Sequence, residues 1–126
     1  MRVLVQNIFD NPAPNVITDP QSRAALMTLV LLDCNDQEQL YLDEITKAEA
    51  GETIRDLYNQ LVDIQLYPDG RALVEELRPR DDSRPDGRRQ SVELTLTELK
   101  ALIHGWLAAK KQFYAEQHAK RQKDEG

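Results

Sequence analysis

Three side chains in this chain of 126 residues have the chemistry of nucleophiles or proton-transfer groups at neutral pH: Cys34, His104 and His118. A cysteine nucleophile needs a general base beside it, and histidine is the side chain whose ordinary pKa lies near neutrality. No histidine is close to Cys34 in the sequence, and His104 points away from the apolar stripe of its predicted helix. We therefore predict that the protein is not an enzyme. A small enzyme that pairs Cys34 with a histidine is a minor alternative.

The sequence lacks the common motifs of phosphate binding, acyl transfer and zinc binding, which are GxGxxG, GxxxxGK[ST], GxSxG and HExxH. An acidic turn at Asp33, Asn35 and Asp36 resembles part of a calcium loop, but the glycine and the final glutamate of such a loop are missing. One cysteine can form neither an internal disulfide nor a metal cluster. We expect no cofactor and no dedicated metal site.

The acidic residues are concentrated in one segment. Between Asp33 and Asp63 there are nine acids against Lys47 and Arg55, a local charge of −7 in a chain whose net charge is −6. Such a segment repels phosphate backbones but attracts a basic protein. It is either a docking surface or a solvated face that only maintains solubility. For the docking surface we predict these residues: Asp33, Asp36, Glu38, Tyr41, Asp43, Glu44, Glu52, Asp56 and Tyr58.

The acidic segment favours a non-enzymatic binding protein with a basic protein partner and no direct contact with nucleic acid. In concrete terms we predict an immunity-type inhibitor that covers the basic cleft of a bacterial nuclease toxin, because such a cleft must be positive to hold phosphates. A related version imitates DNA and inhibits a phage-defence nuclease. The alternative class is a chaperone or adaptor for a secreted or disordered partner.

Length and composition predict one soluble domain. A 40% hydrophobic and 30% charged composition is ordinary for a globular protein. The longest apolar run, 24–32, is far shorter than the roughly 20 residues that span a bilayer, so we expect a cytoplasmic protein that does not enter membranes. We expect one domain over residues 1–119 and a frayed polar tail over 120–126. Whether the protein is a monomer or a dimer stays open.

Apolar periodicity predicts the elements in the first half of the chain. Residues 2–9 read as a strand, and the proline-rich stretch after them reads as a loop. Residues 24–33 are open between strand and helix. We favour a strand that forms a hairpin with 39–45, because the polar residues between them suit a turn. Residues 54, 57, 58 and 61 have helical spacing and predict a helix.

The tetrapeptide PDGR occurs twice, at 68–71 and 85–88, and reads as the same turn used at both bends of a three-stranded meander over 63–95. The Arg-rich stretch 78–89 is either a second contact surface or a linker. Thr95 and Glu98 match a capping box, which predicts a helix to about residue 118. The predicted fold is α+β, a single antiparallel β-sheet of about six strands, including this C-terminal meander, with two helices packed on one face.

Overall fold

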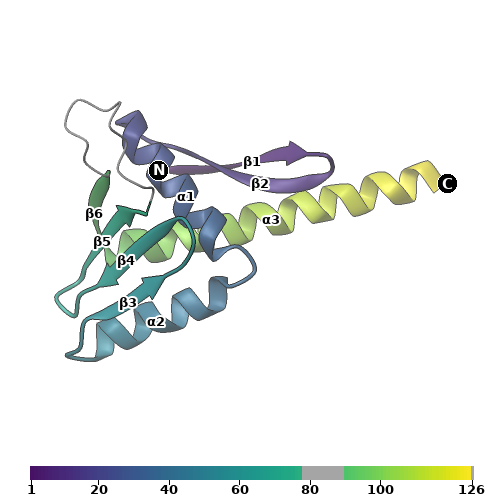
Figure 1. The fold of residues 1–126 in the computed structure, drawn as a ribbon. Helices are drawn as coiled ribbons and strands as arrows, with labels where there is room; N and C mark the ends of the chain where they lie inside the picture. The colour runs from purple at the N-terminus through teal and green to yellow at the C-terminus, as the bar shows by residue number, and fades with distance from the viewer. Residues whose placement is uncertain (78–89, 126) are drawn as a thin grey trace.

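The computed structural model describes residues 1–77 and 90–125, and over these residues the chain is an α+β protein (Figure 1). The elements follow one another in the order β1 (Arg2–Ile8), β2 (Asn11–Ile17), α1 (Gln21–Cys34), α2 (Glu38–Ala50), β3 (Arg55–Tyr58), β4 (Val62–Leu66), β5 (Arg71–Glu76), β6 (Ser91–Thr95) and α3 (Leu96–Glu125).

The described strands form two separate antiparallel sheets. β1 and β2 form a hairpin, and the later strands form a meander in the order β3-β4-β5-β6. The prediction of a single sheet with two helices is therefore wrong, although the α+β class is confirmed. The physical reason is α1, which packs against β2 and against β4 and β6, and so keeps the hairpin apart from the meander.

Two predicted strands are helices. Residues 24–33 and 39–45, which we assigned to a hairpin, lie in α1 and α2. α1 is apolar on most sides because it lies between the hairpin and the larger sheet, and its Leu26, Met27, Val30 and Leu31 are almost completely buried. A helix buried in this way lacks the one-sided pattern by which surface helices are identified.

One predicted helix is a strand. Residues 55–58 form β3 at the edge of the larger sheet, where only Leu57 points into the core. Ile54 and Tyr58, whose spacing predicted one face of a helix, are 56% and 73% exposed. Their helical spacing therefore reflects an exposed surface rather than a core stripe.

The proline-rich stretch is also a strand, β2, rather than a loop. Pro14 and Pro12 pair with Val5 and Asn7 of β1. Val16, two residues after Pro14, donates its N–H to the Thr28 hydroxyl of α1 (3.0 Å) and not to β1. Backbone groups of every second residue in a strand point to the same side. Pro12 and Pro14 therefore share the side on which Val16 faces away from β1, and pairing with β1 needs no N–H from either proline.

The first PDGR copy is a hairpin turn between β4 and β5, as predicted. Gly70 has a φ of +99°, its N–H donates to the carbonyl of Tyr67 (3.1 Å), and the Tyr67 N–H donates to the carbonyl of Arg71 (2.9 Å). Such a φ is ordinary only for glycine. The second copy and the Arg-rich stretch lie outside the described residues.

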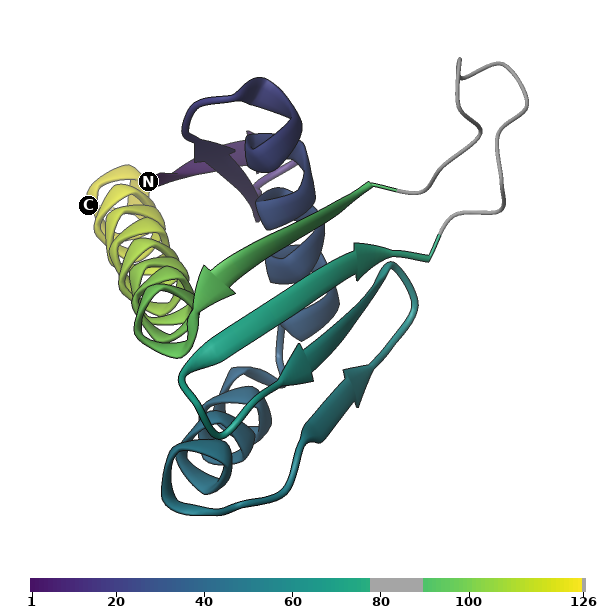
Figure 2. The same cartoon turned by 90° about the vertical axis from the view of Figure 1, so that its left-hand side faces the viewer.

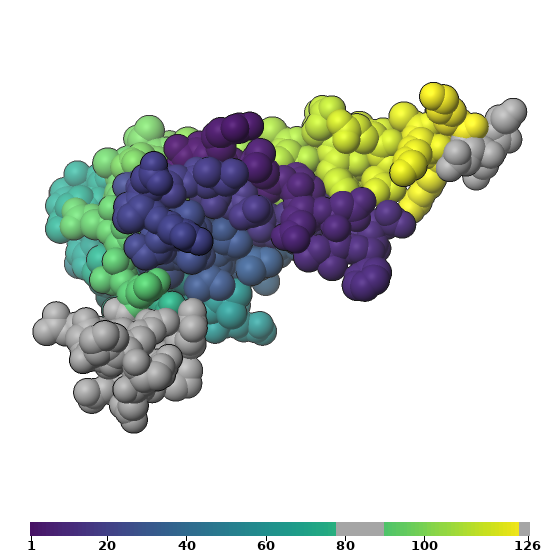
Figure 3. All heavy atoms as spheres, turned by 90° about the horizontal axis from the view of Figure 1, so that it is seen from above, coloured from purple at the N-terminus to yellow at the C-terminus, as the bar shows by residue number. Residues whose placement is uncertain are grey.

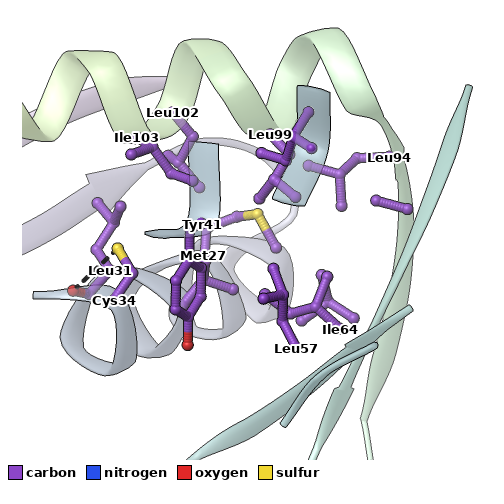
Figure 4. Packing of buried hydrophobic residues seen from close by; sticks show 14 of the residues in the cluster. Met27, Leu31, Cys34, Tyr41, Leu57, Ile64, Leu94, Leu99, Leu102 and Ile103 are labelled. Atoms are coloured by element: carbon purple, nitrogen blue, oxygen red, sulfur yellow. Dashed lines mark hydrogen bonds between the residues drawn. The ribbon is translucent and has the colours of Figure 1, made fainter. Parts of the chain in front are cut away.

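α3 begins with the predicted capping box. The Glu98 N–H donates to the Thr95 hydroxyl and the Thr95 N–H donates to the Glu98 carboxylate, both at 3.0 Å. The helix then buries Leu99 and Ile103 in the common core (Figure 4), and Trp106 is buried with them. It continues to Glu125 beside the β1–β2 hairpin, and the two together form an arm that extends from the body of the protein (Figures 1 and 3).

All three helices lie on one side of the four-stranded sheet (Figure 2). Val62, Ile64 and Val74 point toward them and are fully buried, as are the other inward residues near the middle of the sheet. No described helix covers the opposite face. That face therefore carries the side chains that alternate with the core residues along each strand.

Candidate protein-docking site

The structure places the nine predicted site residues in three kinds of environment. Asp33, Glu38 and Tyr41 are buried, with exposed fractions of 8%, 5% and 2%. Glu44 is partly exposed but paired with basic side chains. The remaining five residues are exposed: Asp36, Asp43, Glu52, Asp56 and Tyr58. Consecutive position in the sequence therefore does not bring all nine to one surface.

The buried acids bind groups of the chain itself. The Asp33 carboxylate accepts the backbone N–H groups of Leu61 and Val62. Glu38 forms an ion pair with Lys110 of α3, and the same ammonium lies 5.2 Å from the centre of the Trp106 ring. Burial with such partners is typical of structural polar groups. These two acids join elements of the fold and are not available to a partner.

Glu44 is neutralised locally. Its carboxylate lies 2.5 Å from Arg55 Nε and 3.3 Å from Lys47 Nζ. The hydrogen bond from Arg55 holds the pKa of Glu44 below its usual range. Because its charge is compensated within the protein, Glu44 contributes little to a long-range field.

A groove between α2 and β3 collects four of the nine residues. Its volume is about 400 Å³, and its lining includes Tyr41 and Glu44 from α2 and Asp56 and Tyr58 from β3. The Tyr41 hydroxyl lies 3.3 Å from the Asn59 side-chain nitrogen, which fixes the floor of the groove at the end of β3. Leu40 stands at its rim with 57% of its surface exposed.

β3 is an edge strand of the sheet in the described part of the chain. Asn59 donates its N–H to the carbonyl of Val62 (3.4 Å), so its backbone groups point toward β4. Backbone groups alternate along a strand, and those of Asp56 and Tyr58 therefore point away from β4. Edge groups of this kind are the template on which an extended segment of another protein can add a strand.

Of the exposed apolar side chains at this edge, Tyr58 is among the predicted docking residues, whereas Ile54, Leu61 and Leu40 are not. Ile54, Tyr58 and Leu61 are 56%, 73% and 37% exposed, and Leu40 adds to them across the groove. For Ile54 and Leu61 the sequence spacing predicts only one face of a helix. Leu40 and Tyr58 line the same groove, and exposed large apolar residues beside a strand edge favour a docking site.

Carboxylates continue from β3 across the open face of the sheet. Asp63 pairs with Tyr58 of β3 on one side and with Glu75 of β5 on the other. Burial and, next, the neighbouring carboxyl group of Asp56 together raise the pKa of Asp63 to about 6. One oxygen of Asp63 is buried without a hydrogen-bond donor. Two carboxyl groups in this arrangement share a proton when one is available.

The cysteine and the two histidines lie in different environments, since the cysteine is buried and both histidines are exposed. Cys34 is fully buried, and the pKa of its thiol is raised to about 12, chiefly by that burial and next by the charge of Glu38. His104 and His118 are exposed on α3. A thiol this basic is a poor nucleophile at neutral pH. Among the residues described, no group of three or more His, Cys, Asp or Glu side chains is arranged to hold a metal ion.

None of the helices in the described ranges is long and apolar enough to cross a membrane. Comparison of the chain with models of protein families, with curated protein sequences and with solved structures found no match. The groove beside β3 and the acidic face next to it are therefore interpreted from their own geometry.

Proposed function

We propose that the protein is a non-enzymatic binding protein that takes an extended segment of a basic partner protein along the free edge of β3. One observation carries this proposal: β3 directs the backbone groups of Asp56 and Tyr58 outward, next to the exposed side chains of Leu40 and Ile54. Backbone hydrogen bonds would supply affinity, and the groove would select alternate side chains of the added strand.

The carboxylates of the open sheet face support a basic partner. Asp56 lines the groove, Asp63 lies opposite Tyr58 on the next strand, and the charge of the whole chain is −6. Negative groups around an apolar site raise the association rate of a positively charged partner. They change the association rate of a neutral partner little. In the most concrete form of the proposal, the partner is a bacterial nuclease toxin and the protein is its immunity-type inhibitor.

The experiment compares two substitutions at one position. Asp56→Pro removes the carboxylate together with the outward N–H, whereas Asp56→Ala removes the carboxylate and keeps the N–H. Proline is tolerated on a strand edge because no ladder hydrogen bond is lost. After the partner has been captured from the native host with the unaltered protein, binding of both variants to that partner is measured by biolayer interferometry.

Strand addition predicts at least tenfold weaker binding for Asp56→Pro than for Asp56→Ala, with a faster dissociation rate. Asp56→Ala should chiefly slow association and flatten its dependence on ionic strength. Equal affinities of the two variants would exclude strand addition at β3. The immunity-type version requires in addition that the captured partner is a nuclease and that one equivalent of the protein abolishes its activity.

A further inference from the structure

The tip of the β1–β2 hairpin presents an aromatic ring to solvent. Phe9 is 96% exposed, and its neighbour Ile8 is 45% exposed. Phe9 and Asp10 form the two-residue connection, with φ values of +50° and +66°. Positive φ at both central residues is the pattern of a type I′ turn, for which Asn-Gly is the favoured pair. A bulky aromatic residue in this conformation is strained.

Side-chain hydrogen bonds fix the strained turn. The Asn7 side-chain oxygen accepts the Asp10 N–H at 2.8 Å, and the Asn11 side-chain nitrogen donates to the Phe9 carbonyl at 3.2 Å. The hairpin is also supported along its length by α3. The backbone of the turn is therefore held by hydrogen bonds while the Phe9 ring stays in solvent, and a strained exposed residue in such a turn indicates a functional role.

A groove of about 460 Å³ runs between β1 and α3 on the same arm. Val3, Val5, Ala109 and Phe113 give it an apolar lining, and each of them is only partly buried. Its rim carries the opposite charges of Glu116 and Lys120. The arm thus bears an exposed aromatic ring at the hairpin tip and a groove with apolar side chains between β1 and α3.

We propose that two copies of this chain pair arm to arm about a twofold axis, with Phe9 of each copy in the β1–α3 groove of the other. A twofold interface requires one surface patch that is complementary to itself, and a patch with both the exposed ring and the groove meets this condition. A rim with both signs of charge can also complement its own copy, because Lys120 of one chain can face Glu116 of the second. The pairing is independent of the β3 edge.

Sedimentation velocity of the full chain over a concentration series tests the pairing. We expect the mass to rise from that of one chain to that of two. Phe9→Asn combined with Asp10→Gly installs the favoured turn pair and removes the ring, so this variant should melt at a higher temperature and self-associate at least tenfold more weakly. Its higher melting temperature separates loss of pairing from loss of folding.

The groove is tested by Gln112→Arg, which places a long charged side chain at its wall, with Gln122→Arg on the same helix as the matched control. Gln112→Arg should weaken self-association and Gln122→Arg should not. A protein that stays monomeric at every concentration overturns the proposal, as does pairing that survives the Phe9 change or is lost with Asp56→Pro. Flotation with vesicles of anionic phospholipid that depends on Phe9 would assign the ring to a lipid surface instead.

Discussion

The carboxylate of Asp33, in the last turn of α1, lies 2.9 Å from the backbone nitrogen of Val62, at the start of β4. The same side chain accepts the N–H of Leu61 at 2.8 Å, and the Asp33 carbonyl accepts the side-chain N–H of Asn59, also at 2.8 Å. The turn between β3 and β4 therefore finds the acceptor for its backbone N–H groups on α1. Asp33 precedes Leu61 by 28 residues in the chain. This acid, first predicted as part of a docking surface, joins α1 to the edge of the sheet.

Replacement of Asp33 by alanine should lower the free energy of unfolding by about 1–3 kcal/mol, because the backbone donors of Leu61 and Val62 lose their acceptor. Chemical denaturation measures the change. Asp43→Ala, at an exposed position of α2, is the control and should stay within about 0.5 kcal/mol of the unaltered protein. Equal effects at the two positions would mean that Asp33 has no structural role.

Asp63→Asn should stabilise the protein at neutral pH, because it removes a carboxylate that burial and, next, the neighbouring Asp56 make costly to ionise. The folded protein binds a proton on Asp63 near pH 6, whereas the ordinary value for this group is 3.8. Between these values the folded state binds more protons than the unfolded chain, so the stability of the unaltered protein rises as the pH falls. The advantage of the variant should therefore shrink between pH 7 and pH 5.

Denaturation curves of Asp63→Asn and of the unaltered protein over this pH range give the difference between their free energies of unfolding. The other titrating groups are the same in both proteins, so their contributions cancel in this difference. Asp56→Asn should reproduce the effect, since it removes the other member of the pair. A constant difference between Asp63→Asn and the unaltered protein at all pH values would contradict proton sharing by Asp56 and Asp63.

Thr95→Ala should destabilise the protein by about 1 kcal/mol, because the hydroxyl that accepts the Glu98 N–H is lost at the start of α3. Thr97→Ala changes an exposed threonine within the same helix and serves as the matched control. The hydrogen bond from the Thr95 N–H holds the pKa of Glu98 below its usual range, so the box also weakens in acid. Thermal denaturation of both variants at neutral pH decides whether the box is energetically significant.

The Cys34 thiol should be unreactive toward a disulfide reagent such as DTNB in the native state at about pH 8, because it is buried and its pKa is raised to about 12. In concentrated guanidinium chloride the same thiol should react at once. Absorbance at the wavelength of the released thiolate follows both reactions. Rapid modification of the native protein would restore the interpretation of Cys34 as a nucleophile.

Local signals predicted the parts of the fold that depend on neighbouring residues. The turn at Pro68–Arg71 and the box at Thr95 and Glu98 need only a few adjacent side chains, and both occur where the sequence indicates them. Ile103 and Trp106 also lie on the predicted stripe of α3 and are buried. In each case the determining interactions are local in the sequence.

The missed elements depend on distant partners. Leu40 and Leu42 alternate as in a strand, but α2 buries Leu42 with Tyr41 and Ile45 and leaves Leu40 in solvent. Contacts with distant elements accompany this choice, among them the ion pair of Glu38 with Lys110 of α3. Distant contacts also decide which predicted site residues are accessible. Asp56 and Tyr58 are exposed, whereas Asp33 and Tyr41 are buried by contacts that no sequence spacing indicates.

The placement of α3 also constrains how the chain folds as it is made. This helix closes the core with Leu99, Ile103 and Trp106 and supports β1 from the opposite end of the sequence. A ribosome releases β1 long before α3, so the nascent hairpin has no helix to pack on and the sheets have no completed core. The common core can therefore close only after α3 has been released, and until then the apolar strands are exposed to aggregation.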